Sequence, residues 1–162
     1  MKELQGSAIT EIDLPAKVYF ARLASIDRYP AWFEVVRAVE ILERERGGRP
    51  RLVRVELHVP QSPFGTDFEL VIAVRADRPR AMQFTRVPDG PADRDRLEIT
   101  WQLTEDGSTQ IEFEFDAAVS FVPGYLPVGS AGDAIAEAIL GAATAAFTDS
   151  APDSVRRTRG RH

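Results

Sequence analysis

The sequence predicts an α+β domain in which a curved antiparallel sheet of seven strands wraps around one long C-terminal helix. Three observations support this prediction. From about residue 35 to residue 119, apolar and polar residues alternate with a period of two, as in strands that have one covered face. A short helical pattern opens at Pro15, before this run. Residues 130–149 follow the run and show a wide apolar arc at helical spacing, which needs a broad apolar surface to lie on.

The first strand and two short helices are expected at the N-terminus. Residues 6–13 alternate and predict a strand. Pro15 is tolerated in a first helical turn, and three apolar residues follow at spacings of four and three, which predicts a helix over about 15–26. These three are Tyr19, Leu23 and Ile26. Pro30 ends this helix, and the segment 30–33 predicts a second short helical turn.

Six further strands are expected to follow in consecutive hairpins. Glycine in the segments ERGGR and EDGS marks two of the turns, because glycine accepts positive φ. The clearest alternation is in the last strand, where four apolar residues alternate with polar ones: Ile111, Phe113, Phe115 and Ala117. The six strands are expected over residues 35–44, 51–59, 66–75, 81–87, 96–104 and 109–119.

The C-terminal helix is rich in small residues and is expected to end near residue 149. Small side chains facing a concave sheet would leave room for a cavity, because a helix that fills a core usually carries larger side chains. Close packing of helix and sheet explains the same pattern equally well, and the sequence leaves both interpretations open. We expect one domain over residues 1–149 and a disordered basic tail over residues 150–162, which contain four arginines.

Composition limits the class of protein. The chain has 162 residues, of which 44% are hydrophobic and 28% charged, as in soluble globular proteins. It contains no cysteine, which excludes disulfides and thiolate chemistry. The net charge is −5, and it is −9 without the last seven residues, so nucleic-acid binding is not expected. The sequence shows no signal peptide and no membrane span, so we expect a cytoplasmic protein without integral membrane association.

The order of elements and three short motifs resemble a known family. The motifs are DLPAKVY from Asp13, DRYPAW from Asp27 and VRAVEIL from Val36. Together they look like the START-like helix-grip superfamily, and within it the polyketide cyclase/dehydrase and lipid-transport (SRPBCC) family. The resemblance in layout covers about residues 5–148. It implies a hydrophobic cavity between the sheet and the C-terminal helix, entered near the short helices and the loop before the long helix.

Candidate ligand-binding residues follow from the inward phase of the strands and from this implied cavity. Trp32 and Phe33 close one end of the sheet, either as a plug of the core or as part of the cavity wall. Tyr125 lies in a Pro- and Gly-rich segment that is either a gate or a static connector. Arg86 shares the phase of Phe84 and either anchors a ligand oxygen or is solvated at the strand end. The full set is Trp32, Phe33, Phe68, Leu70, Phe84, Arg86, Trp101, Phe113, Tyr125, Ile139, Leu140 and Ala143.

Catalytic residues cannot be assigned from the sequence. His58 is the only histidine besides the C-terminal residue, and its phase with Arg54 and Glu56 places it on the solvent face. With two histidines and no cysteine, no metal site is expected, and no segment has the pattern of a phosphate-binding loop. We therefore expect no cofactor.

Three functions remain, in this order. The first is a carrier or sensor that binds a small hydrophobic ligand such as a lipid, quinone or polyketide. The second is a polyketide cyclase, aromatase or dehydratase that uses the same cavity and orients its substrate by shape. The third is an interaction protein whose own side chains fill the cavity. The sequence does not decide between a monomer and a homodimer.

Overall fold

The computed structural model describes residues 2–59, 66–119 and 130–159, and within these ranges it contains one seven-stranded antiparallel sheet, two α-helices and a 3₁₀-helix. The strands are β1 (Lys2–Ile12), β2 (Val36–Arg44), β3 (Pro50–Val59), β4 (Thr66–Asp77), β5 (Ala81–Arg86), β6 (Arg96–Asp106) and β7 (Ser108–Val119). The helices are α1 (Ala16–Ala24), the 3₁₀-helix η1 (Ile26–Ala31) and α2 (Ser130–Arg159). The predicted fold class is confirmed.

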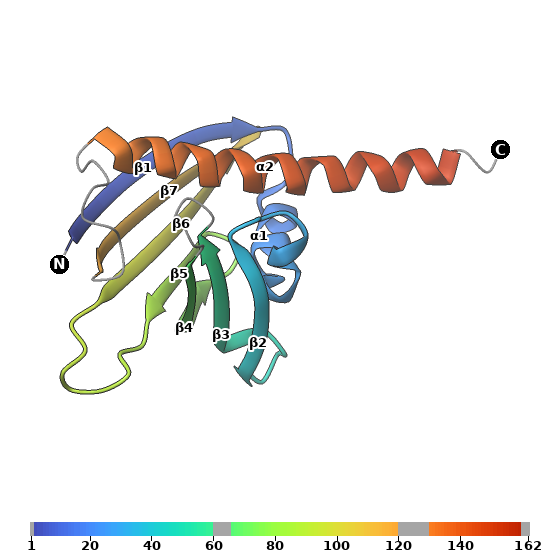
Figure 1. The fold of residues 1–162 in the computed structure, drawn as a ribbon. Coiled ribbons are helices and arrows are strands. Elements are labelled where there is room, and N and C mark those ends of the chain that lie inside the picture. The colour runs from blue at the N-terminus through green and yellow to red at the C-terminus, as the bar shows by residue number, and fades with distance from the viewer. Residues whose placement is uncertain (1, 60–65, 120–129, 160–162) are drawn as a thin grey trace.

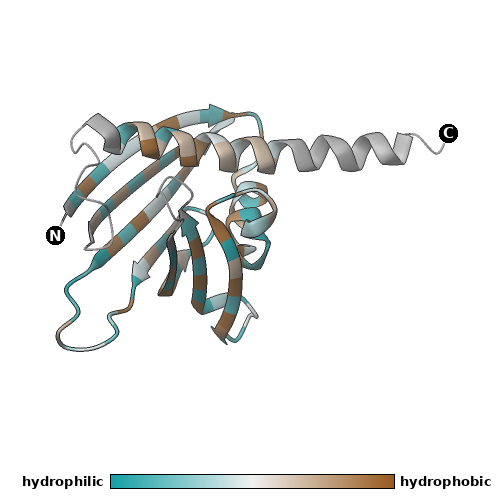
Figure 2. Cartoon of the chain, viewed as in Figure 1, coloured by the Kyte–Doolittle hydropathy of each residue, from teal (hydrophilic) through white to brown (hydrophobic). Residues whose placement is uncertain are grey.

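The sheet has the strand order β1-β7-β6-β5-β4-β3-β2. Strands β2 to β7 therefore pair with their neighbours in sequence, and β1 pairs with β7 along its whole length, from Lys2 opposite Val119 to Ile12 opposite Thr109. Figure 1 shows the sheet curving under α2, which lies close to β1 and extends beyond the sheet at its C-terminal end. Figure 2 shows the bands of hydrophobic and hydrophilic residues that alternate along the strands. This alternation gives the sheet one apolar face and one polar face.

The first helix lies in its predicted place, and the second differs from the prediction in both place and type. η1 begins at Ile26 rather than at residue 30, and it is a 3₁₀-helix. The backbone amide of Arg28 donates to the carbonyl of Ser25 at 3.0 Å, and that of Trp32 donates to Tyr29 at 3.1 Å. Both bonds span three residues, as in a 3₁₀-helix. Pro30 lies inside this helix, although it has no amide hydrogen to donate.

Helix α2 packs on the rest of the molecule through one narrow stripe. The buried residues of its described part recur at spacings of four, three and four: Ala136, Leu140, Ala143 and Phe147. Phe147 meets the ring of Tyr19 on α1 edge to face at a centroid distance of 5.0 Å, and the Tyr19 and Thr144 hydroxyls share a hydrogen bond of 3.2 Å. The helix continues to Arg159, ten residues beyond the end expected near residue 149. The division into a domain and a basic tail at that point stays a prediction.

The first turn of α2 lies directly against β1. A Cβ atom on Gly6 would overlap the carbonyl oxygen of Gly132, and one on Gly132 would overlap the carbonyl of Gln5. Only residues without a side chain allow the two backbones to come this close. Beside this contact, the Asp133 carboxylate accepts a hydrogen bond of 3.0 Å from the amide of Ser7. The contact therefore fixes the N-terminal end of α2 to the edge strand of the sheet.

Candidate ligand-binding cavity

A cavity of about 280 Å³ lies between the apolar face of the sheet, η1 and α2. Each strand contributes alternate residues of the inward phase, so the wall follows directly from the period of two. For example, Ala117 is the cross-strand neighbour of both Leu4 and Leu97, and all three residues line the cavity. From the helix, Ile135 and Ile139 complete the wall. Ile135 is 40% exposed, so the wall reaches solvent beside the first turns of α2.

The wall is apolar and strongly aromatic. Every described residue that lines the cavity is aliphatic or aromatic, and none carries a charge. The seven aromatic residues in it are Tyr29, Trp32, Phe33, Phe84, Trp101, Phe113 and Phe115. Such a surface favours apolar ligands, because the burial of apolar surface contributes most of the free energy of their binding.

The aromatic residues of the segment SIDRYPAWF form one end of the cavity and also hold α2. Trp32 stacks on Phe33 at a centroid distance of 5.5 Å and an interplanar angle of 11°. Its ring also meets Phe147 of α2 edge to face at 5.2 Å, and Tyr29 lies 5.0 Å away. The two interpretations from the sequence are therefore compatible, because these residues pack in the core and line the cavity at once.

The polar atoms of the aromatic wall are already engaged or enclosed. The Tyr29 hydroxyl donates a hydrogen bond to the carbonyl of Leu23, and burial raises the pKa of Tyr29 well above its usual value. Outside the wall, burial also raises the pKa of Tyr19 to about 12, although its hydrogen bond to Thr144 opposes this shift. Both phenols are neutral at physiological pH. The indole nitrogen of Trp101 is buried without a hydrogen-bond partner, and its ring packs edge to face on Phe113 at 4.7 Å.

Arg86 has the inward phase but does not line the cavity. Its guanidinium donates to the Asp93 carboxylate at 2.7 Å and to the carbonyl of Asp95 at 2.9 Å. Asp93 also accepts the backbone amides of Asp89 and Asp95. The hydrogen bond from Arg86 and these two amides hold the pKa of Asp93 well below its usual value. Arg86 therefore holds the loop between β5 and β6, and Asp93 neutralises its charge, while its buried Nε atom has no hydrogen-bond partner.

The remaining candidates divide between the cavity wall and the packed core. Seven of the twelve line the cavity: Trp32, Phe33, Leu70, Phe84, Trp101, Phe113 and Ile139. Leu140 and Ala143 are buried on the stripe of α2 that packs against the core, and neither they nor Phe68 line the cavity. Tyr125 lies outside the described residues. The prediction missed Ile135, although it precedes Ile139 by one helical turn and the spacing could have shown it.

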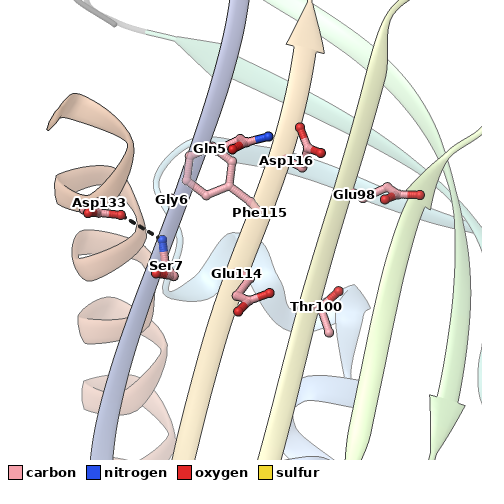
Figure 3. A pocket seen from close by; sticks show the side chains of 9 residues that line it. All are labelled: Gln5, Gly6, Ser7, Glu98, Thr100, Glu114, Phe115, Asp116 and Asp133. Carbon is pink, nitrogen blue, oxygen red and sulfur yellow. Dashed lines mark hydrogen bonds between the residues drawn. The ribbon is translucent and has the colours of Figure 1, made fainter. Parts of the chain in front are cut away.

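A larger hollow of about 570 Å³ lies on the opposite, polar face of the sheet (Figure 3). It covers two rows of cross-strand neighbours on β1, β7 and β6. Figure 3 shows the carboxylates of Glu98, Glu114 and Asp116 there. At the margin, Asp133 is hydrogen-bonded to Ser7. Among the described residues, no group of three or more His, Cys, Asp or Glu side chains is arranged to hold a metal ion. The apolar cavity is therefore the better candidate for a ligand site.

Sequence comparison identifies the family. The family described as polyketide cyclase/dehydrase and lipid transport matches residues 12–148 of the chain. The chain belongs to this family. As in the resemblance noted above, the match includes the motifs near Asp13, Asp27 and Val36. No curated protein matches the chain by sequence.

Several solved structures share this fold. A START superfamily protein from Mycobacterium smegmatis has a TM-score of 0.65 and 17% identity, and the match covers 93% of this chain and 98% of that one. Human STARD10 has a TM-score of 0.68 and 13% identity, with 98% and 68% covered. The Zhui aromatase/cyclase from Streptomyces sp. R1128 has a TM-score of 0.55 and 16% identity, with 96% and 95% covered. At these identities the likeness shows the shared fold alone.

Proposed function

We propose that the protein binds one small hydrophobic molecule in the cavity between the sheet and α2, as a carrier or sensor. The observation that supports this function is the wall of the cavity, whose described residues are all aliphatic or aromatic. An apolar ligand that enters it is stabilised by about 25 cal/mol for each Å² of apolar surface removed from water. It needs no hydrogen bond from the wall. We place this activity in the cytoplasm; of the described helices, none is long and apolar enough to cross a membrane.

A second candidate function is cyclisation or aromatisation of a polyketide-like chain in the same cavity. The aromatic pair Trp32 and Phe33 favours it, because flat rings stack well on aromatic side chains. Catalysis would then depend on the shape of the cavity and its orientation of the reacting chain. Arg86, the best sequence candidate for an assisting group, is engaged with Asp93, so carrier or sensor comes first.

Native mass spectrometry of the purified protein is the first test, followed by organic extraction and identification of any released molecule. Binding is then measured with the uncharged dye N-phenyl-1-naphthylamine, whose fluorescence increases in apolar surroundings. Ala117→Phe places a large ring in the cavity and should abolish most of the dye signal. Gly141→Leu is the matched control, because Gly141 lies on the exposed side of α2, where a Cβ meets no atom within 4 Å.

The outcomes separate the candidate functions. A co-purified hydrophobic molecule, or dye binding that Ala117→Phe removes and Gly141→Leu leaves intact, supports the carrier or sensor. Turnover of a polyketide-like chain by the protein, with loss of turnover in Ala117→Phe, would favour the enzyme. Failure of the folded wild-type protein to take up dye would contradict both and support a closed core.

A further inference from the structure

We propose that the ligand is compact and uncharged, with no more than the size of a small drug-like molecule inside the cavity, so that a lipid with two long acyl chains does not fit. This inference rests on the proposed function and narrows the class of ligand. It follows from the volume of the cavity, the absence of charge in its described wall, and the contacts of the nearest cationic side chain of inward phase.

The volume sets the size of the ligand. A cavity of about 280 Å³ lies at the lower end of the range of roughly 300–1,000 Å³ that is typical of pockets for drug-sized molecules. The cavity is therefore large enough for one single chain or one small ring system, and too small to enclose two long acyl chains.

The charge of the wall sets the polarity of the ligand. An ionised group that leaves water needs an opposite charge or several hydrogen bonds, and its burial without them is very costly. None of the described lining residues supplies a charge, and the hydroxyl of Tyr29 is bonded to Leu23. By sequence, residues 60–65 and 120–129, which lie outside the described ranges, contain no Lys, Arg or His. Neither segment can supply a cation, wherever it lies.

Arg86 is the cation that the strand pattern would bring nearest to the wall, because it pairs with Ile72, which lines the cavity. Its contacts with Asp93 and Asp95 hold it in place, and its side chain is only 7% exposed. Asp93 already neutralises its charge. The buried Nε atom of Arg86 has no hydrogen-bond partner, but one donor beside a charge that is already neutralised favours a neutral oxygen over a carboxylate.

The test is displacement of N-phenyl-1-naphthylamine by a series of 1-alkanols from six to fourteen carbons. We expect affinity to rise by about fourfold for each methylene while the chain is shorter than the cavity. It should then level off within this series, because further methylenes stay in water. At pH 8, decanoate should bind at least about tenfold more weakly than 1-decanol.

Two variants should shift the alkanol length at which affinity levels off, in opposite directions. Ala117→Leu adds three carbon atoms to the wall and should shift the plateau to alkanols shorter by about three carbons. Ile139→Ala removes three carbon atoms and should shift it to longer alkanols by a similar amount. Gly141→Leu should leave the plateau unchanged, since this residue faces away from the cavity.

Failure of this inference differs from failure of the proposed function. If the dye binds but affinity still rises steadily to fourteen carbons, or decanoate binds as well as 1-decanol, the function stands and the ligand class is wrong. If neither variant changes the alkanol length at which affinity levels off, the residues that limit the size of the ligand lie elsewhere, and the ligand class is likewise wrong. If the folded protein binds neither dye nor any alkanol, the function and this inference both fail.

Discussion

At the scale of single residues, the ion pair of Arg86 shows how a local contact decides the chemistry of a neighbouring cavity. Arg86 sits at the end of β5 with the same phase as Phe84, and only its partners keep it out of the wall. Asp93 accepts three hydrogen bonds, from Arg86 and from two backbone amides, so it organises the loop that follows β5. Its ionised form is the one that these donors stabilise.

The stability that Asp93 contributes should depend on pH. Its pKa is depressed in the folded protein from the ordinary value of 3.8. The contribution is therefore complete above about pH 5, and it is lost as the pH falls towards the folded pKa, because the unfolded chain takes up the proton first. We expect Asp93→Asn to lower the melting temperature clearly at pH 7, and the difference from wild type to shrink by at least about half at pH 2.5.

Asp89→Asn is the matched control for this prediction, since the side chain of Asp89 is 84% exposed and lies 3.8 Å from Arg86. It should change the melting temperature little at either pH. Thermal unfolding followed by circular dichroism measures both variants. A destabilisation by Asp93→Asn that is equally large at pH 2.5 would show that the ionised carboxylate is not what holds the loop.

The alternation of apolar and polar residues along the strands predicted residues of the cavity wall, but it did not predict the ion pair of Arg86. The residues Leu70, Phe84, Trp101 and Phe113 were placed correctly on the wall by a period of two. Arg86 obeys the same period, yet its partner lies in a surface loop whose path the sequence pattern does not give. Local periodicity thus specifies which side a residue faces, and tertiary contacts decide what it does there.

At the scale of elements, the crossing of α2 over β1 depends on two glycines. Gly6 and Gly132 bring the two backbones into contact, and the Phe115 ring lies close by, 2.7 Å from where a Cβ on Gly6 would be. Since Phe115 and Ile135 both line the cavity, this crossing also sets the width of the cavity at one end.

We expect Gly6→Ala to destabilise the fold by about 1–3 kcal/mol, because the added methyl group forces α2 away from β1. This corresponds to a fall in melting temperature of several degrees. Gly90→Ala is the control: a Cβ there meets no atom within 4 Å, so the change should be within about 0.5 kcal/mol of neutral. Chemical denaturation measures both. Equal stability of Gly6→Ala and wild type would contradict the close contact.

The sequence predicted the elements well, but it did not predict how α2 is rotated. The small residues were expected to leave room for a ligand. In the structure Ala136 and Ala143 are fully buried in contact with the core, while Ala134, Ala138 and Gly141 are exposed. The bulky residues Ile135 and Ile139 face the cavity instead. The helix is apolar over so much of its surface that hydrophobic periodicity does not single out one face.

At the scale of the whole molecule, the cavity results from the arrangement of the sheet and helix rather than from small side chains. The described part of α2 contacts mainly β1, at one edge of the sheet, and it leaves much of the apolar face of β3 and β4 uncovered. Residues such as Val55 and Leu70 consequently line a hollow. This arrangement depends on contacts that are distant in sequence, which is why the sequence left an open cavity and a filled core as alternatives.

The fold should not need the last thirteen residues. Within the part of α2 whose side chains the structure describes, which ends at Thr148, Phe147 is the last buried residue, and beyond the sheet the helix continues alone in Figure 1. A chain ending at residue 149 loses four Arg and one Asp, so its net charge changes from −5 to −8. We expect its melting temperature to stay within about 2 °C of the full chain, because the removed segment follows the part of α2 that packs against α1 and β1. Its affinity for N-phenyl-1-naphthylamine should be unchanged.

A shorter truncation, ending at Leu140, is the control for this prediction. It removes Ala143 and Phe147, and with them the contacts of Phe147 with Tyr19 and Trp32 that hold α2 and one end of the cavity. Loss of a buried Phe alone costs about 3–5 kcal/mol, so this chain should be largely unfolded or unable to bind dye. Circular dichroism and dye titration on both truncations make the comparison. If the chain ending at residue 149 melts several degrees lower or loses dye binding, the last thirteen residues belong to the folded domain, and the boundary at residue 149 is wrong.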